Sequence, residues 1–233
     1  MKEIFIFKLF FLQFMLFSQE NVIESRSILN SISSTNLING SGTWVNGKVE
    51  DKTILGSTYL FPSWTGVFNV VSNEGNEYKL FNLNYNIKNK TLESLISSDS
   101  VYQYDISKIN FIKFNNLKYN LYSNKNSQNL NGLYQELFSS NDLILLKEFK
   151  IDLVIGAINP LTQEKVSNNE YVKFFNYFLK NGDKLNNIKL NKKNLMLIFE
   201  NKKDLIKDYV NKNSLSFSNE SDVIKIFNYY SSI

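Results

Sequence analysis

The clearest pattern of hydrophobic and polar positions lies between Tyr78 and Tyr122. Its first part alternates at period two, in the order Phe81, Asn82, Leu83, Asn84, Tyr85, Asn86 and Ile87. That period is typical of a strand with one buried face and one face in water. Further short runs follow, at Thr91 to Ile96, Val101 to Ile106, Ile109 to Phe114 and Leu117 to Tyr122. Strands joined by such short turns pair as antiparallel neighbours, which predicts an up-and-down sheet. We expect its water-facing side to carry Asn82, Asn84, Asn86 and Asn120.

Shorter strands are expected before this stretch. Gly40 to Gly47 has the composition of a turn, and Ile54 to Phe61 and Val67 to Val71 are β-branched and aromatic segments. Between them, Pro62 and Gly66 predict a turn or a sheet edge, because proline cannot donate a ladder hydrogen bond and glycine permits a positive φ.

Two hairpins are expected after the central stretch. Leu133 to Phe138 and Leu143 to Val154 are apolar runs joined by a turn-rich Ser-Ser-Asn-Asp segment, which favours a hairpin, although the second run is also compatible with a helix. Tyr171 to Leu179 and Leu185 to Leu190 flank an Asn-Gly pair, the strongest short-range hairpin signal. Polar residues 123–131 and the Gly- and Pro-containing segment 155–169 are expected to be loops.

The period of the pattern changes after residue 190. The hydrophobic residues fall on helical faces, in the sets Leu195, Ile198 and Phe199, then Leu205, Ile206, Tyr209 and Val210, then Val223, Ile226, Phe227 and Tyr230. Asn201 and Asn219 stand where N-caps belong, each with an aspartate three residues later. Such short helices are marginal alone, so we expect them to pack on the sheet or on each other.

These patterns predict a β-rich α+β fold. Residues 40–190 would form the body, an antiparallel curved sheet or a half-barrel meander, and residues 191–233 would add two or three short helices packed on it.

The N-terminal residues resemble an export signal. Lys2 precedes an apolar run from Leu9 to Phe17, and Ser18 is a small residue at a plausible cleavage point. The run is shorter than the ~20 apolar residues of a spanning helix. We therefore expect a signal peptide at 1–18 and a Ser- and Asn-rich flexible lead-in at 19–39; the alternatives are a buried N-terminal helix and a short helix in the lead-in. No later stretch predicts a transmembrane helix. The expected location is therefore the periplasm, the cell surface or the extracellular space of a Gram-negative bacterium.

Composition removes most catalytic schemes. The chain has neither histidine nor cysteine, which excludes histidine bases, thiol nucleophiles, disulfides and the common zinc sites. No glycine-rich phosphate loop and no Ca²⁺-loop spacing occurs, so we expect no cofactor and no metal. The formal charge of +4 is too small for a nucleic-acid footprint.

Carboxylates, serine-lysine pairs and aromatic residues are the remaining candidates for chemistry. Glu136 and Glu148 lie on the two arms of a predicted hairpin and could act as a pair, although separate solvated side chains are the simpler interpretation. Possible ligand-facing aromatics are Tyr59, Phe61, Trp64 and Phe68. In a curved sheet they would line a cleft for a sugar or an apolar ligand; the alternative is that they pack in the core. We predict no catalytic residue.

Two groups of short segments carry a resemblance to known proteins. They are Gly56 to Phe61 with Leu83 to Ile87 and Val101-Tyr102, and the tail from Lys192 through Phe199, Lys202-Lys203 and Ile206 to Tyr229-Tyr230-Ser231. On these residues the chain resembles uncharacterised secreted proteins of Bacteroidota. The resemblance implies export in a Gram-negative cell and supplies no catalytic residue.

The function that these observations favour is a non-catalytic envelope or secreted module that binds a small ligand or another envelope component. Two alternatives stay open, a carboxylate-dependent glycan hydrolase and a carrier that holds an apolar ligand in a half-barrel. The sequence leaves the partner and the oligomeric state undetermined.

Overall fold

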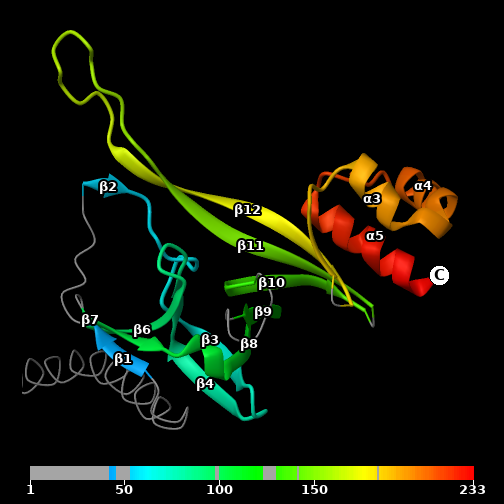
Figure 1. The fold of residues 1–233 in the computed structure, drawn as a ribbon, viewed down its shortest axis with the longest axis horizontal. Coiled ribbons are helices and arrows are strands. Elements are labelled where there is room, and N and C mark those ends of the chain that lie inside the picture. Colours follow the sequence, from blue (N-terminus) through cyan, green and yellow to red (C-terminus); the bar gives the residue numbers. More distant parts are fainter. Residues whose placement is uncertain (1–41, 46–52, 98–99, 123–129, 141, 183) are drawn as a thin grey trace, which may run out of the picture.

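The computed structural model describes residues 42–45, 53–97, 100–122, 130–140, 142–182 and 184–233. These residues form two β-sheets and a group of C-terminal helices (Figure 1). The β-rich α+β class is therefore confirmed. The expected signal peptide, the lead-in at 19–39 and most of the 123–131 loop lie outside the described residues. No helix among the described residues has the length and apolar character needed to cross a membrane.

The smaller sheet has four strands in the order β1-β7-β6-β5. Their bounds are β1 Gly42–Val45, β5 Asn84–Asn86, β6 Thr91–Ser97 and β7 Ser100–Tyr104. All neighbours in this sheet are antiparallel.

The larger sheet has the order β13-β12-β11-β10-β9-β8-β3-β4, with the short strand β2 pairing parallel to β12. The bounds are β2 Ile54–Leu55, β3 Thr65–Ser72, β4 Glu77–Asn82, β8 Ile109–Phe114, β9 Leu117–Tyr122, β10 Gly132–Ser139, β11 Leu143–Val154, β12 Asn169–Asn181 and β13 Lys184–Ile188. Both predicted hairpins are confirmed, because β10 pairs with β11 and β12 pairs with β13 in antiparallel register. Leu143–Val154 is thus a strand rather than a helix.

The expected single meander from Tyr78 to Tyr122 is wrong. β4 belongs to the larger sheet, the chain crosses at Leu83 into the smaller sheet for β5, β6 and β7, and it returns through the 3₁₀ turn Ile106–Lys108 to β8. Period-two alternation identifies the faces of a strand but carries no information on its partner, which is why the change of sheet escaped prediction.

The asparagines of this stretch were also placed incorrectly, since Asn84, Asn86 and Asn120 are buried. The Asn84 side chain pairs with the backbone of Phe61 as a neighbouring strand would. Its Oδ1 accepts from the Phe61 amide and its Nδ2 donates to the Phe61 carbonyl, both at 2.9 Å. A side-chain amide can satisfy a backbone in this way because it carries the same donor and acceptor groups. Asn86 Oδ1 accepts from the Asn89 amide in its own turn, and Asn120 Nδ2 donates to Glu136 within the larger sheet. These asparagines therefore satisfy nearby polar groups instead of facing water.

The segment Ile54 to Phe61 is a regular strand only at its start. Gly56, with φ +83°, ends β2. The chain then runs beside β5, where the Leu60 amide donates to Tyr85 and the Ile87 amide donates to Thr58. Only glycine adopts such a φ without strain.

Three helices follow the strands, α3 Lys192–Ile198, α4 Lys203–Lys212 and α5 Glu220–Ser232. The predicted N-cap Asn219 is confirmed, because its Oδ1 accepts from the Asp222 amide. Asn201 is not a cap; it lies inside the 3₁₀ turn Glu200–Lys202, and the side chain that caps a helix in this region is Asn191, at the start of α3.

Among the described residues, a small cluster of Leu130, Tyr134 and Leu146 accompanies two large hydrophobic cores. The first lies between the smaller sheet and the β3-β4-β8-β9 part of the larger sheet, and the second lies between β10, β11, β12 and the three helices. β11 contributes to both, with Phe149 and Ile151 packed against the first core and Leu145 inside the second. The long β11-β12 hairpin thus joins the two halves of the fold (Figure 1).

Candidate binding surfaces

The aromatic residues that the sequence singled out are mainly core residues. Phe61 and Phe68 are buried in the first core, and Tyr59 is buried with its ring 4.5 Å from that of half-buried Trp64. Their rings face each other rather than an open cleft, which agrees with the core-packing alternative. Phe61 and Phe68 also touch Phe114, at ring distances of 5.0 and 4.1 Å, and they therefore support a side chain that does reach a pocket.

The buried carboxylates are held by donors. Glu93 is fully buried, and its oxygens accept from Tyr59 Oη at 2.6 Å, from Thr91 Oγ1 at 2.5 Å and from Gln103 Nε2 at 3.0 Å. This arrangement is typical of a structural carboxylate.

The carboxylates of the proposed pair, Glu136 and Glu148, are also held by hydrogen-bond donors. Glu136 accepts from Lys118 Nζ at 3.0 Å and from Asn120 Nδ2 at 2.8 Å. Glu148 accepts from Tyr134 Oη at 3.2 Å and pairs with Lys150 Nζ at 2.8 Å. Burial, together with the charge of Glu148, raises the pKa of Tyr134 above its ordinary value. Each carboxylate has its own cation and its own hydrogen-bond donor, so the two do not form an isolated acid and base.

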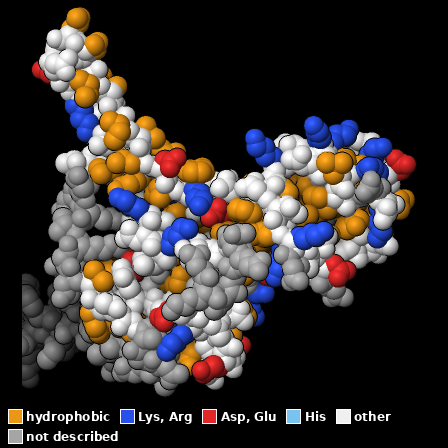
Figure 2. Space-filling view, in the orientation of Figure 1, with side chains coloured by type: hydrophobic (Ala, Val, Ile, Leu, Met, Phe, Trp, Pro, Cys, Tyr) orange, Lys and Arg blue, Asp and Glu red, His pale blue; other side chains and the backbone are white. Residues whose placement is uncertain are grey.

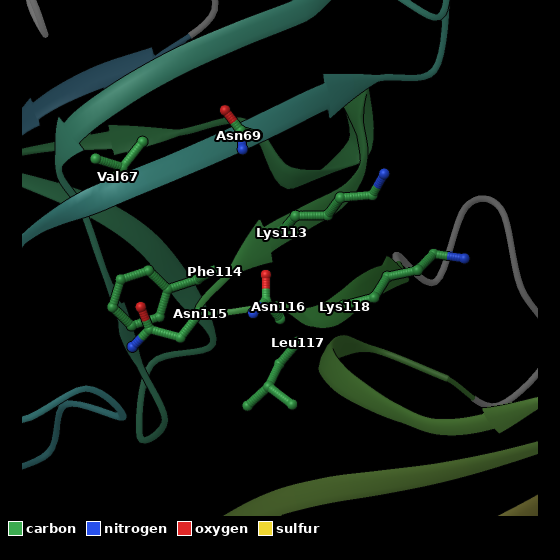
Figure 3. A pocket seen from close by; sticks show the side chains of 8 residues that line it. All are labelled: Val67, Asn69, Lys113, Phe114, Asn115, Asn116, Leu117 and Lys118. Atoms are coloured by element: carbon green, nitrogen blue, oxygen red, sulfur yellow. The ribbon is translucent and has the colours of Figure 1, made fainter.

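A pocket of about 500 Å³ lies on the larger sheet beside the β8-β9 turn (Figure 3). Its walls come from three strands and one turn, and the lining residues are Val67, Asn69, Lys113, Phe114, Asn115, Asn116, Leu117 and Lys118. The two lysine side chains extend together along one side, and Phe114 and Val67 lie at the other (Figure 3). The volume is in the range of small-molecule sites.

A tight turn shapes one wall of this pocket. Asn115 and Asn116 have φ angles of 49° and 62° and connect Phe114 to Leu117, which pair across the hairpin. Asparagine tolerates this left-handed region, and two such residues give the turn that suits the twist of a hairpin. Both side-chain amides line the pocket.

The second surface is a projecting arm, which we define as residues 149–176. It comprises the distal half of β11, the connection 155–168 and the first part of β12 (Figure 1). The strands pair without a bulge from Leu143 opposite Asn181 to Val154 opposite Glu170. The connection is itself hydrogen-bonded, with the Val166 amide donating to Ala157 at 2.8 Å. The loop expected at 155–169 is confirmed, because no strand lies between Val154 and Asn169 apart from the isolated bridge of Ile158 with Lys165. The arm is therefore a two-stranded ribbon that ends in this hydrogen-bonded loop.

Apolar side chains are exposed along this arm. Leu161 has 92% of its surface exposed and Ile155 has 66%. The large hydrophobic residues exposed on the arm are Leu153, Val154, Ile155, Ile158, Leu161, Val166, Val172, Phe174 and Phe175. Figure 2 shows hydrophobic side chains along the ribbon and at its tip.

The base of the arm is anchored to the first core. Lys173 Nζ donates to the Tyr59 carbonyl, and burial lowers the pKa of its ammonium group. The outer edge of β12 is partly occupied, since β2 pairs with Asn169 and Glu170 and β13 pairs from Tyr177 onward. Among the described residues, the stretch from Tyr171 to Asn176 pairs only with β11.

Sequence reasoning missed both surfaces. The interpretation of 155–169 as a loop does not account for its apolar residues. Ile155, Ile158 and Leu161 are the signal that could have indicated an exposed apolar tip. The pocket depends on which strands are neighbours, and the sequence alone does not show this.

Comparisons with known proteins were made for the whole chain. No family model, curated protein or solved structure matches it. The resemblance to secreted Bacteroidota proteins therefore stays a prediction. Among the described residues, no cluster of three or more acidic side chains is arranged to hold a metal ion.

Proposed function

We propose that the protein is an exported, non-catalytic module that attaches to another protein of the cell envelope through its arm. The observation that carries this proposal is the series of apolar side chains exposed from the base of the arm to its tip. Scattered exposed hydrophobic residues are ordinary, but a large apolar patch usually marks an interaction site. Export rests on the pattern of residues 1–18.

The charges of the arm favour a protein over a lipid surface as the partner. The arm carries three basic and three acidic residues, namely Lys150, Lys165, Lys173, Asp152, Glu164 and Glu170. Segments that bind anionic membranes usually have an excess of lysine and arginine. The arm has no such excess, and its apolar residues extend along the strands as well as over the tip.

The free edge of β12 indicates the form of the partner. An exposed strand edge can accept an added strand, and the side chains beside it give specificity. The stretch Tyr171 to Asn176 offers about 20 Å of unpaired backbone at 3.3 Å per residue, with Val172, Phe174 and Phe175 exposed along it. The 13-residue β12 of a second copy would overlap β2 or β13 if it lay along this edge. A short extended segment of a different protein fits between them.

The alternatives find less support. A hydrolase needs a carboxylic acid and a carboxylate that are free to act, whereas Glu136 and Glu148 are each held by a lysine. A half-barrel carrier needs an apolar cavity, whereas the pocket beside the β8-β9 turn has ammonium and amide groups in its wall.

Site-specific photo-crosslinking in the native host tests the arm. A photoreactive phenylalanine analogue would replace Leu161 in one variant and Phe174 in another, and the exposed Leu205 of α4 would be replaced in the control. We expect the two arm positions, and not the control, to crosslink to one protein identified by mass spectrometry. Binding would then be remeasured with that purified protein, where Val172→Ser with Phe174→Ser should weaken it at least tenfold.

Three outcomes would contradict the proposal. The first is crosslinking of the arm only to a second copy of the chain. The second is crosslinking only to lipid, and the third is equal crosslinking from the control position on α4.

A further inference from the structure

The strand register places a row of charged and polar side chains across the larger sheet. Lys79 lies opposite Asn69, Asn69 opposite Lys113, Lys113 opposite Lys118, and Lys118 opposite Glu136. Directly opposite residues of antiparallel strands point to the same face, so these five side chains form one row over β4, β3, β8, β9 and β10. The pocket beside the β8-β9 turn includes the central part of this row (Figure 3).

Two lysines lie next to each other at the centre of this row, which is unusual. Lys113 and Lys118 are direct cross-strand partners, and like charges in that position normally destabilise a sheet. Both ammonium groups lie over the Phe111 ring, at 5.5 and 5.0 Å from its centroid. Glu136 neutralises Lys118 at 3.0 Å. No ion pair joins Lys79 or Lys113 to any other described residue, so these two cations are available to a ligand.

The other groups of the pocket suit a hydroxyl-rich ligand. Asn69, Asn115 and Asn116 each present an amide that can both donate and accept, and the side chains of the three make no hydrogen bond to another described residue. Val67 and Leu117 expose about half of their surface beside them, and Phe114 is fixed by stacking on Phe68 at 4.1 Å. A sugar ring offers hydroxyl groups to amides and C–H faces to apolar side chains, whereas a simple anion would not use the apolar wall.

We infer that this row and its pocket bind an acidic saccharide. The anionic groups would lie between Lys79 and Lys113, and the sugar ring would rest against the three asparagines, Val67 and Leu117. The distance from Lys79 to Lys118 is three strand spacings, or about 14 Å, which suits a short oligosaccharide. This inference is independent of the proposed role of the arm.

Isothermal titration calorimetry on the full chain tests the inference. The probes are an oligogalacturonate, a sulfated oligosaccharide, a neutral oligosaccharide of the same length and inorganic sulfate. We expect the oligogalacturonate or the sulfated oligosaccharide to bind at least tenfold more tightly than the neutral one. We expect Lys113→Met to weaken this binding about tenfold and Asn69→Ala about threefold, and higher salt to weaken it further.

Lys212→Met on α4 is the matched control, because that lysine is exposed and belongs to a helix that does not line the pocket. Equal binding of neutral and acidic saccharides would overturn the inference, as would no binding at all. Competition by inorganic sulfate at the same concentration as the saccharide would overturn it by showing a site for anions only. An equal loss of binding in the Lys212 variant would overturn it by showing a general charge effect.

Discussion

At the scale of single residues, buried tyrosine hydroxyl groups limit stability at high pH. Burial raises the pKa of Tyr104 to about 12 and that of Tyr119 to about 12, because a phenolate in the first core would lose its hydration. The unfolded chain ionises the same groups near pH 10. Their contribution to stability is therefore complete below pH 10 and is lost as the pH rises toward 12, at about 1.4 kcal/mol per pH unit for each tyrosine.

Tyr104→Phe should reduce this loss. Urea unfolding of wild type and variant between pH 9 and pH 11.5 would show a smaller fall in the free energy of unfolding for the variant, because one buried hydroxyl group no longer ionises on unfolding. The Tyr229→Phe variant is the control, since it leaves both buried hydroxyl groups in place. Identical slopes for Tyr104→Phe and wild type would contradict this assignment.

The residue scale also shows why the sequence misplaced the asparagines. Asn84 and Asn86 alternate with hydrophobic residues as surface residues do, yet both are buried. An amide in that pattern can face water or satisfy an irregular backbone, and only the neighbouring chain decides between them. The partner of Asn84 is Phe61, far away in sequence, so the pattern around Asn84 could not show the contact.

At the scale of elements, local signals were predictive where they were strong. The stripe of α5 and its Asn219 cap were predicted because both signals lie within a single stretch of chain. The Asn181-Gly182 turn was predicted for the same reason, and Gly182 has a φ of 55°. The pairing of β3 with β8 was not predicted, since β4 and three strands of the smaller sheet lie between them in the sequence. Sequence-distant pairing depends on total burial, which no short window measures.

One side chain fastens the helices to the sheet. Glu220, in the first turn of α5, accepts from Tyr177 Oη at 2.8 Å and pairs with Lys147 Nζ at 2.8 Å. Burial and this hydrogen bond raise the pKa of Tyr177. Because Lys147 is mostly buried, loss of its partner leaves a poorly hydrated charge.

Glu220→Ala should therefore lower the free energy of unfolding by about 2 kcal/mol. It should also make the C-terminal helices more sensitive to limited proteolysis, which mass spectrometry would locate. Asp204→Ala removes an exposed ion pair with Lys207 on α4 and should have a much smaller effect. A similar loss in both variants would indicate that Glu220 acts only on its own helix.

At the scale of the whole molecule, the two surfaces lie on different parts of one scaffold. The pocket lies over the first core, and the arm projects from the hairpin that joins the two cores (Figure 1). The sequence contained the components of the pocket, such as Lys113 and Asn69, without indicating that they would be neighbours. Only the strand order brings them together. By contrast, the aromatic residues that were predicted to face a ligand pack mainly in the core. The sequence pattern could not separate the two roles, because bulky rings beside a Pro-Gly turn can either line a cleft or fill the core.

The tip of the arm should be dispensable for folding, because the residues between Ile158 and Lys165 are largely exposed and belong to neither core. Replacing Ile158 to Lys165 by Asn-Gly keeps the hydrogen bond from the Val166 amide to Ala157 and closes a two-residue hairpin. We expect the free energy of unfolding in urea to change by less than about 1 kcal/mol.

Phe138→Ala in the second core is the positive control and should cost about 3 to 5 kcal/mol. If the shortened arm lost a comparable amount, the tip would be part of the folded core, and the exposed Ile158 and Leu161 would need no partner. If it retained full stability while losing the crosslinked partner, folding and attachment would be separate properties of the chain. We expect this separation because the arm is packed against a core only at its base. Its exposed apolar side chains contribute nothing to folding until another surface covers them.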